Sequence, residues 1–302
     1  NFFGSDLRNS DFSNSDVTNA NFELSDLTGS NFEGAKVDQI KLKRAKLLDV
    51  NFSGVKFNSD LNYVDFRGSN LSDADLTEHN LKNTVLSNTN MKGANLTGAI
   101  LSYEDIGRYN FLDNSDVRFT NFTGATLVGI DFTKIKNKSL AGVDLSYASL
   151  SHADLTDVDM SKSILFHSNF WNADLSDQDF TVITNHIIGS MFIDANLSNS
   201  NFEGVNLSPL EYFTNTFKNK ADQISNSHME HGILIDPIGH TQIFLLSEEV
   251  RGNDLVVSYF YFNNFNNANL ENANFKNTEL WYASFYSANL TNADLSGADL
   301  RN

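Results

Sequence analysis

A five-residue period runs through most of this sequence and constrains the fold more than any other feature. Each unit has a small residue, then Asp or Asn, then a large apolar residue, then two mostly polar residues. The segments 5–7 and 10–12 read SDL and SDF, and 293–295 near the other end reads ADL. With about 50 such units, the chain has to be treated as a repeat protein.

Neither an α-helix nor a flat strand accommodates this period. A helix turns by about 100° per residue, so every fifth residue moves around its axis. In a flat strand the side chains alternate between two faces, so successive apolar centres would point to opposite sides. The pattern is satisfied if each unit forms one short side of a coil and the chain turns a corner between units. The apolar centre and the small residue two positions before it then point inward.

The motif resembles that of the pentapeptide-repeat family, and the resemblance covers roughly 250 of the 302 residues. It implies an all-β fold, a right-handed quadrilateral β-helix (solenoid) with four units per coil and about 12 coils. Residues 20 apart would then lie above one another. We therefore expect Phe12, Phe32 and Phe52 to form one internal column.

Four short slips in register interrupt the period, and we expect a corner bulge or short loop at each. They are one residue lost between Phe57 and Leu61, one gained between Phe111 and Val117, three gained between Phe132 and Leu140, and two gained between Phe180 and Ile187.

A long insertion at 208–257 separates the repeats of 1–207 from those of 258–302, which we expect to continue the same solenoid from a centre at Phe260. Within it, 232–246 has two apolar stretches around an Asp-Pro-Ile-Gly turn, which predicts a β-hairpin. A third apolar run follows at 255–262. The hairpin either covers the solenoid as decoration, or it binds a partner or caps a coil.

The two ends of the sequence lie within the repeats. Phe2 and Leu300 are both apolar centres, whereas solenoids normally end in polar caps. We expect either a portion of a longer protein, or a subunit whose ends stack on another copy to give a dimer or filament.

The composition excludes several functional classes. The absence of cysteine removes disulfides, thiolate metal sites and cysteine nucleophiles. An excess of 38 acidic over 21 basic residues gives a net charge of −17 and disfavours direct binding to nucleic acid. No apolar run reaches the ~18 residues of a membrane span. Without a phosphate loop, nucleophile elbow or nucleotide fingerprint, we expect no enzyme activity and no cofactor.

One basic belt interrupts the acidic surface. Lys36, Lys41 and Lys46 occupy the Asp/Asn slot of successive units, so they should face outward on three sides of one coil. Lys56 should lie directly above Lys36. We interpret this belt either as a solvated patch or as a site for an acidic partner or anionic surface.

Aspartates fill the same slot in the middle of the chain, where Asp154 should stack on Asp174 and Asp159 on Asp179. Some pentapeptide-repeat proteins resemble B-DNA in shape and charge and bind type II topoisomerases, so the resemblance allows a DNA-mimicking inhibitor as an alternative function. However, the motif accepts Asp and Asn alike. The basic belt also departs from the pattern of that subfamily.

Three histidines of the insertion, His228, His231 and His240, lie near Glu230 and Asp236 and could hold zinc or copper. Their spacing matches no established metal motif. We therefore expect a non-enzymatic scaffold or assembly protein, a rigid acidic solenoid that contacts a protein partner or copies of itself.

Overall fold

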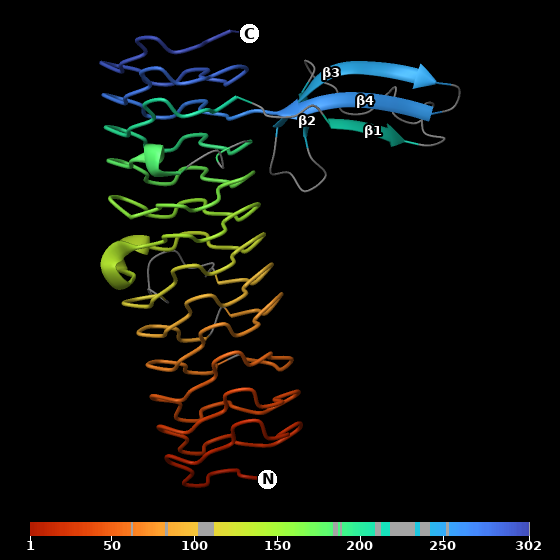
Figure 1. Ribbon diagram of the computed structural model, residues 1–302, viewed down its shortest axis with the longest axis vertical. Helices are drawn as coiled ribbons and strands as arrows, with labels where there is room; N and C mark the ends of the chain where they lie inside the picture. The colour runs from red at the N-terminus through yellow and green to blue at the C-terminus, as the bar shows by residue number, and fades with distance from the viewer. Residues whose placement is uncertain are drawn as a thin grey trace.

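The computed structural model describes residues 1–61, 63–81, 84–101, 112–183, 187, 189–208, 213–217, 233–235, 242–251 and 254–301. The chain forms the expected right-handed quadrilateral β-helix, an elongated solenoid whose coils stack along one axis (Figure 1). Most neighbouring coils are joined by parallel bridges between residues 20 apart, such as Asp11 and Asn31. Among the described residues, no helix has the length and apolar character needed to traverse a bilayer.

A tight turn ends each side of the coil and explains the five-residue period. The N–H three positions after each apolar centre donates to the carbonyl of that centre, as Ser5 does to Phe2 at 3.1 Å. The residue two positions after the centre has a positive φ, for example 57° at Asn9 and 72° at Gly29. This φ is typical of a type II turn, and Gly and Asn adopt it at low cost. The turn therefore explains why Asn and Gly are frequent at the last position of the unit.

The Asp or Asn before each centre stabilises the same turn from outside. Its Oδ1 accepts a hydrogen bond from the N–H two residues further on, as Asp11 does from Ser13 at 2.9 Å. Asn51 accepts from Ser53 in the same way at 3.1 Å. Because carboxylate and amide oxygens both cap the turn, this slot has a structural role whichever residue fills it.

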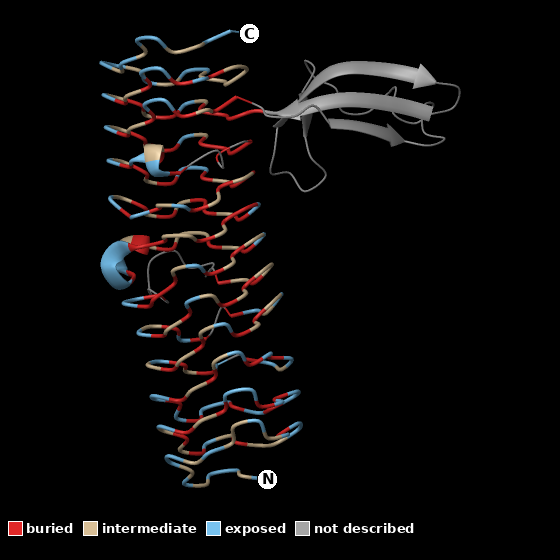
Figure 2. Cartoon of the chain, in the orientation of Figure 1, coloured by how far each residue is buried: buried red, intermediate tan, exposed pale blue. Residues whose placement is uncertain are grey.

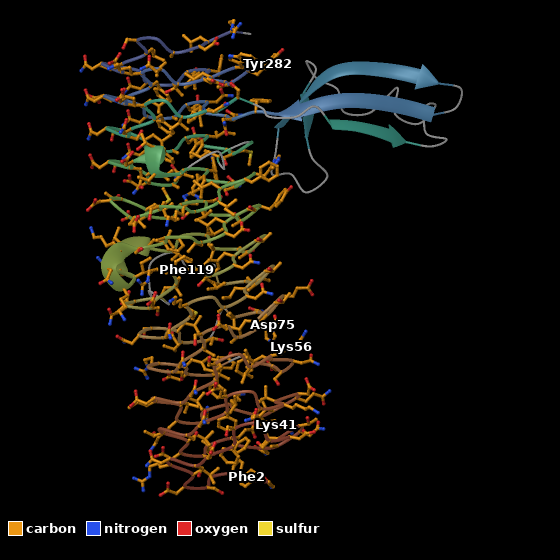
Figure 3. All side chains as sticks on the ribbon, viewed as in Figure 1. Phe2, Lys41, Lys56, Asp75, Phe119 and Tyr282 are labelled. Carbon is orange, nitrogen blue, oxygen red and sulfur yellow. The ribbon has the colours of Figure 1, made fainter. Side chains whose placement is uncertain are left out.

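The apolar centres stack inside the solenoid in columns. The rings of Phe12, Phe32 and Phe52 form the predicted column, with centroids 4.7 and 5.1 Å apart. Near the other end, Phe192 lies between two further rings at 5.1 and 5.0 Å. These distances match the ~4.8 Å between paired strands, so the rings and the backbone ladder share one repeat. Figure 2 shows buried residues along the coils between the two end coils, which are mostly exposed or intermediate, and Figure 3 shows the charged side chains outside the solenoid.

The bridge spacings locate three of the predicted register slips. The spacing falls to 19 after Phe57, rises to 23 where three residues are added, and is 22 where two are added. The added residues after Asp131 form two short 3₁₀ turns, η1 (Phe132–Lys134) and η2 (Lys136–Lys138). A third turn, η3 (Phe180–Val182), begins the two-residue slip.

The predicted gain of one residue between Phe111 and Val117 is wrong. Leu112 is fully buried and lies five residues before Val117, so Leu112 is the apolar centre at this point. Coils here are joined at a spacing of 26, and the extra length falls within 102–111, a stretch outside the described residues that includes Phe111. Phe111 continues the period from the units before it, and Leu112 fits the units after it. The sequence pattern alone could not decide between these two adjacent apolar residues, and it selected Phe111.

The insertion contains an antiparallel sheet beside the C-terminal coils (Figure 1). Its strands are β1 (Phe213–Phe217), β2 (Ile233–Ile235), β3 (Gln242–Arg251) and β4 (Asp254–Tyr261), in the order β1-β4-β3-β2. The predicted hairpin is the pair β2 and β3, and the third apolar run is β4.

The predicted restart of the repeat at Phe260 is wrong, because Phe260 lies in β4 and pairs with Phe244 of β3. The first buried centre after the sheet is Phe265. Parallel bridges, for example from Asn196 to Asn269, join the coils on the two sides of the insertion. The domain limits at 207 and 257 remain predictions, and β4 extends across the second of them.

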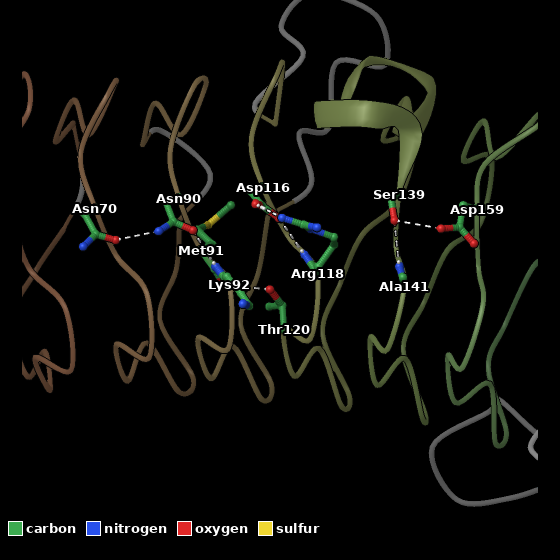
Figure 4. Close-up of polar contacts among 10 residues, drawn as sticks. All are labelled: Asn70, Asn90, Met91, Lys92, Asp116, Arg118, Thr120, Ser139, Ala141 and Asp159. Atoms are coloured by element: carbon green, nitrogen blue, oxygen red, sulfur yellow. Dashed lines mark hydrogen bonds and ion pairs between the residues drawn. The ribbon is translucent and has the colours of Figure 1, made fainter.

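Asparagine side chains form a ladder along one side of the solenoid. Asn51 Nδ2 donates to Asn31 Oδ1 at 3.0 Å, and Asn70 Nδ2 donates to Asn51 Oδ1 at 2.9 Å. Asn90 Nδ2 continues the ladder to Asn70 Oδ1 at 2.9 Å (Figure 4). Each amide gives one bond and receives another, which a carboxylate cannot do. Asp and Asn are therefore not equivalent at these positions.

We expect Asn70→Asp to lower the free energy of unfolding by roughly 1–2 kcal/mol, because it removes a donor and places a carboxylate beside the Asn51 oxygen. Asp144→Asn is the matched control, since Asp144 caps its turn through Oδ1 and an amide oxygen can replace it. Urea unfolding followed by circular dichroism measures both. Equal effects of the two substitutions would contradict the ladder.

The turns also hold their carboxylates in the charged form. The pKa of Asp6 is lowered to about 2, first by the hydrogen bond from the Arg8 guanidinium and then by the Arg8 N–H. The pKa of Asp11 is lowered by the N–H and hydroxyl of Ser13. In the unfolded chain an aspartate has a pKa of ~3.9, and in the folded chain these carboxyls have a lower one. Each charged carboxylate therefore contributes its full stabilisation above pH ~3.9. That contribution is lost as the pH falls through the pKa of the folded state.

We therefore expect the unfolding temperature to be nearly constant between about pH 7 and 5 and to fall as the pH is lowered from about 4 to 2. Thermal unfolding followed by circular dichroism across this range tests the expectation. The double variant Asp11→Asn with Asp16→Asn keeps both caps but removes two titrating groups, so its decline should be shallower. A stability that rises below pH 4 would contradict this account.

Candidate functional site

The structure places the predicted basic belt on successive sides of one coil. Lys36, Lys41 and Lys46 are all exposed, and their backbones bridge to the coil on their N-terminal side. Lys46 Nζ lies 3.2 Å from Asp26 Oδ2. Among the described residues, Lys36 and Lys41 form no ion pair.

Lys56 is matched by an acidic neighbour on the next coil. Its backbone bridges to Asp75, and its Nζ lies 3.3 Å from Asp75 Oδ2. Both side chains are labelled in Figure 3. Within the described part of the chain no backbone bridge joins Lys56 to Lys36, although the period places them 20 residues apart. An exposed pair of this kind contributes little to stability, so Lys56 remains able to exchange partners.

Two grooves lie beside the belt, where one residue is missing between Phe57 and Leu61. The first has a volume of about 870 Å³ and is lined by residues that include Lys41 and Lys43. The second has a volume of about 740 Å³. Tyr63, 56% exposed, lines both grooves, and Lys43 Nζ lies 5.2 Å from its ring centroid.

The two grooves differ in charge. The first mixes its two lysines with Glu23, Asp60 and Glu78. In the second, three cations face one carboxylate; the lining charges are Arg44, Lys46, Arg67 and Asp65. Burial raises the pKa of Asp65, but hydrogen bonds from Arg67 outweigh it, so the pKa is lowered overall. The second groove therefore carries net positive charge on an acidic protein.

The predicted acidic residues are each used by the turns. Asp154 bridges to Asp174, as expected from the period, and each accepts an N–H from its own turn at 3.0 Å. Asp159 bridges to Ser139, whose Oγ donates to Asp159 Oδ2 at 3.0 Å (Figure 4). Asp179 bridges to Asn201, and no bridge between described residues joins it to Asp159, on which the period placed it. A role for these four carboxylates in binding remains a prediction.

The predicted metal ligands His228, His231 and His240 lie outside the described residues. Within the part of the chain that is described, no three His, Asp or Glu side chains gather as a metal site.

The sequence pattern missed Tyr63, Arg67 and the groove that they share with Arg44. The available signal was the slip after Phe57, because a coil one residue short cannot follow the path of the coil beside it. An exposed tyrosine and two arginines next to such a slip could have indicated a surface feature.

The sequence matches the family model of pentapeptide repeats in 8 copies, which cover more than half of the chain. The matched residues are 5–44, 25–59, 38–77, 65–102, 132–161, 188–208 and 264–302. No curated protein matches the chain.

Several solved structures are similar to this chain. HetL, a pentapeptide repeat protein involved in heterocyst differentiation regulation in the cyanobacterium Nostoc, is 19% identical, with 99% of this chain and 90% of HetL covered and a TM-score of 0.28. Trypsin-treated QnrB1, a plasmid-mediated fluoroquinolone resistance protein, is 20% identical over 63% of this chain and 84% of QnrB1, with a TM-score of 0.36. A pentapeptide repeat protein of the Arabidopsis thaliana thylakoid lumen is 27% identical over 43% and 69%, with a TM-score of 0.21. On the family match and the period, this chain belongs to the pentapeptide-repeat family.

Proposed function

We propose that this chain is a non-enzymatic protein-binding scaffold, a rigid acidic rod that contacts a protein partner or copies of itself. The observation that carries the proposal is the continuity of the core. Among the described residues, buried apolar residues continue from Val17 to Leu280, and hydrogen bonds join successive coils along most of this length, including across the insertion. A solenoid of this kind has stiffness along its axis because each coil is bonded to its neighbours.

Such a rod holds outward side chains at fixed intervals. The turn positions lie at corners, and corners of successive coils are separated by ~4.8 Å. A protein partner needs only about 800 Å² of surface to form a standard interface, and one side of the rod offers that area. The basic belt and its grooves are the place where this surface departs most from its acidic, regular background.

A DNA-like decoy for a type II topoisomerase is the alternative. A column of carboxylates from Asp131 through Asp154 to Asp174 favours it. However, one whole side of the rod carries no acidic residue in this slot over a long stretch. The residues of that column are Asn80, Ile100, Thr126, Ser149, Asn169, Met191, Asn264 and Ser284. A supercoiling assay of a type II topoisomerase with the protein added separates the two functions. A scaffold that does not bind the topoisomerase leaves its activity unchanged at micromolar concentration, whereas a decoy inhibits it.

We expect chemical cross-linking in cells that express the chain to enrich a small set of proteins at least tenfold over an unrelated β-helix of similar charge. The cross-links should map to the outer corners of the rod. Light scattering of the purified chain tests self-association separately. A chain that enriches no protein and stays monomeric at high concentration would contradict the proposal.

A further inference from the structure

The slip after Phe57 interrupts the backbone ladder on three sides of one coil. In the preceding coil, each centre donates its N–H to the next coil, as Phe22 does to Lys41 at 2.9 Å and Leu27 to Lys46 at 3.0 Å. In the coil that contains the belt, the equivalent groups have no hydrogen-bond partner among the described residues. They are the N–H groups of Val37, Leu42, Arg44, Leu47 and Asp49 and the carbonyls of Ala35, Ile40 and Ala45.

The fourth side of the same coil stays closed. Phe52 donates to the Asn70 carbonyl at 2.7 Å, and Asn70 donates to the Val50 carbonyl at 2.8 Å. On the open sides, the one remaining backbone bond among the described residues runs from Gln39 to the Asn58 carbonyl at 3.1 Å. Two serine hydroxyls of the next coil also donate across, Ser59 to the Val37 carbonyl at 3.1 Å and Ser69 to the Leu47 carbonyl at 2.8 Å. The two coils are thus joined firmly along one side and weakly along the others. We call this interruption the seam.

The two grooves lie along the seam. The first groove is lined by 39–43 on one coil and 58–61 on the next, and the second by 44–48 on one coil and Asp65, Arg67 and Gly68 on the next. Backbone groups without partners favour any ligand that can bond them, because buried polar groups are nearly always paired. Arg44 and Asp49 are exposed residues at corners of this coil, and the Asp49 nitrogen lies beside Gly68 of the next coil. A ligand would therefore reach the seam first at these corners.

We propose that the seam binds an extended acidic peptide segment of a partner protein, an assignment that rests on the scaffold function. The peptide adds to the open edge as a strand, with the amides of Arg44 and Asp49 as its first donors. As it docks, it widens the seam and reaches the amides of Leu42 and Leu47, which are nearly buried in the free chain.

The cations at the second groove favour an acidic peptide over a neutral one. Arg44 forms no ion pair among the described residues, and Lys46 has only an exposed pair with Asp26 that exchanges at little cost. Carboxylates of the peptide contact these two cations in the second groove, while Tyr63 packs against the chain between the grooves. A nucleic acid does not suit the site, because it offers no backbone strand and is repelled by the net charge of −17.

A fluorescein-labelled deca-glutamate peptide tests the proposal by fluorescence anisotropy, with deca-serine as the neutral probe. The full chain should bind deca-glutamate and not deca-serine. The double variant Arg44→Glu with Lys46→Glu should bind at least tenfold more weakly. Lys92→Glu with Lys162→Glu makes the same change in net charge away from the grooves and should retain binding within about twofold.

A register repair gives an independent test. Inserting one glycine between Asn58 and Ser59 restores the unit spacing and supplies the residue that the turn prefers. This variant should close the seam, raise the unfolding temperature and weaken deca-glutamate binding at least tenfold. In the unmodified chain, hydrogen exchange at the amides of Leu42, Arg44, Leu47 and Asp49 should be fast, and the peptide should slow it.

Several outcomes overturn the proposal. They are the absence of deca-glutamate binding, equal weakening by the two charge-reversal variants, and slow exchange at the seam in the free chain. Self-association that is lost on Arg44→Glu with Lys46→Glu would make a second copy the occupant and would also overturn it. If deca-glutamate does not bind but cross-linking still enriches partner proteins, the scaffold function is retained. The assignment of the peptide site to the seam is then wrong.

Discussion

Backbone hydrogen bonds between successive coils hold this solenoid together, and every other feature depends on them. A coil can bond its neighbours only if its corners fall at the same places, and the turn with positive φ at every fifth residue ensures this. The stacked rings, the buried small residues and the outward carboxylates all follow from that register. A change of one residue in the spacing therefore affects the ladder before it affects the core, as the seam shows.

Much of the fold could be predicted because the five-residue period determines, for each residue separately, whether its side chain points into the core or outward. A centre such as Phe32 must be buried, and its neighbours in the column follow by simple addition. The prediction failed where the period gave no unique answer. Phe111 and Leu112 are adjacent apolar residues, and Phe260 continues the spacing while it belongs to β4. The short strand β1 was missed because its sequence, FTNTF, carries too little apolar alternation to be distinguished from a loop.

The candidate site was predictable only in part. The positions of Lys36, Lys41 and Lys46 in the repeat placed them on the surface of one coil, and the structure agrees. The grooves arise instead from how two coils separate when one is shorter. That separation depends on packing across the whole coil, so no local motif encodes the contact between Tyr63 and Lys43 or the gathering of Arg44 with Arg67.

The asparagine ladder has a consequence for the lifetime of the molecule. Asparagine is among the thermolabile residues of proteins, because its amide hydrolyses slowly to a carboxylate. Each such event at Asn51 or Asn90 would insert a charge into a row of mutual amide bonds and break it at that rung. The chemical ageing of these asparagines is thus coupled to the mechanical integrity of the rod, whereas an aspartate in the same slot has no amide to lose.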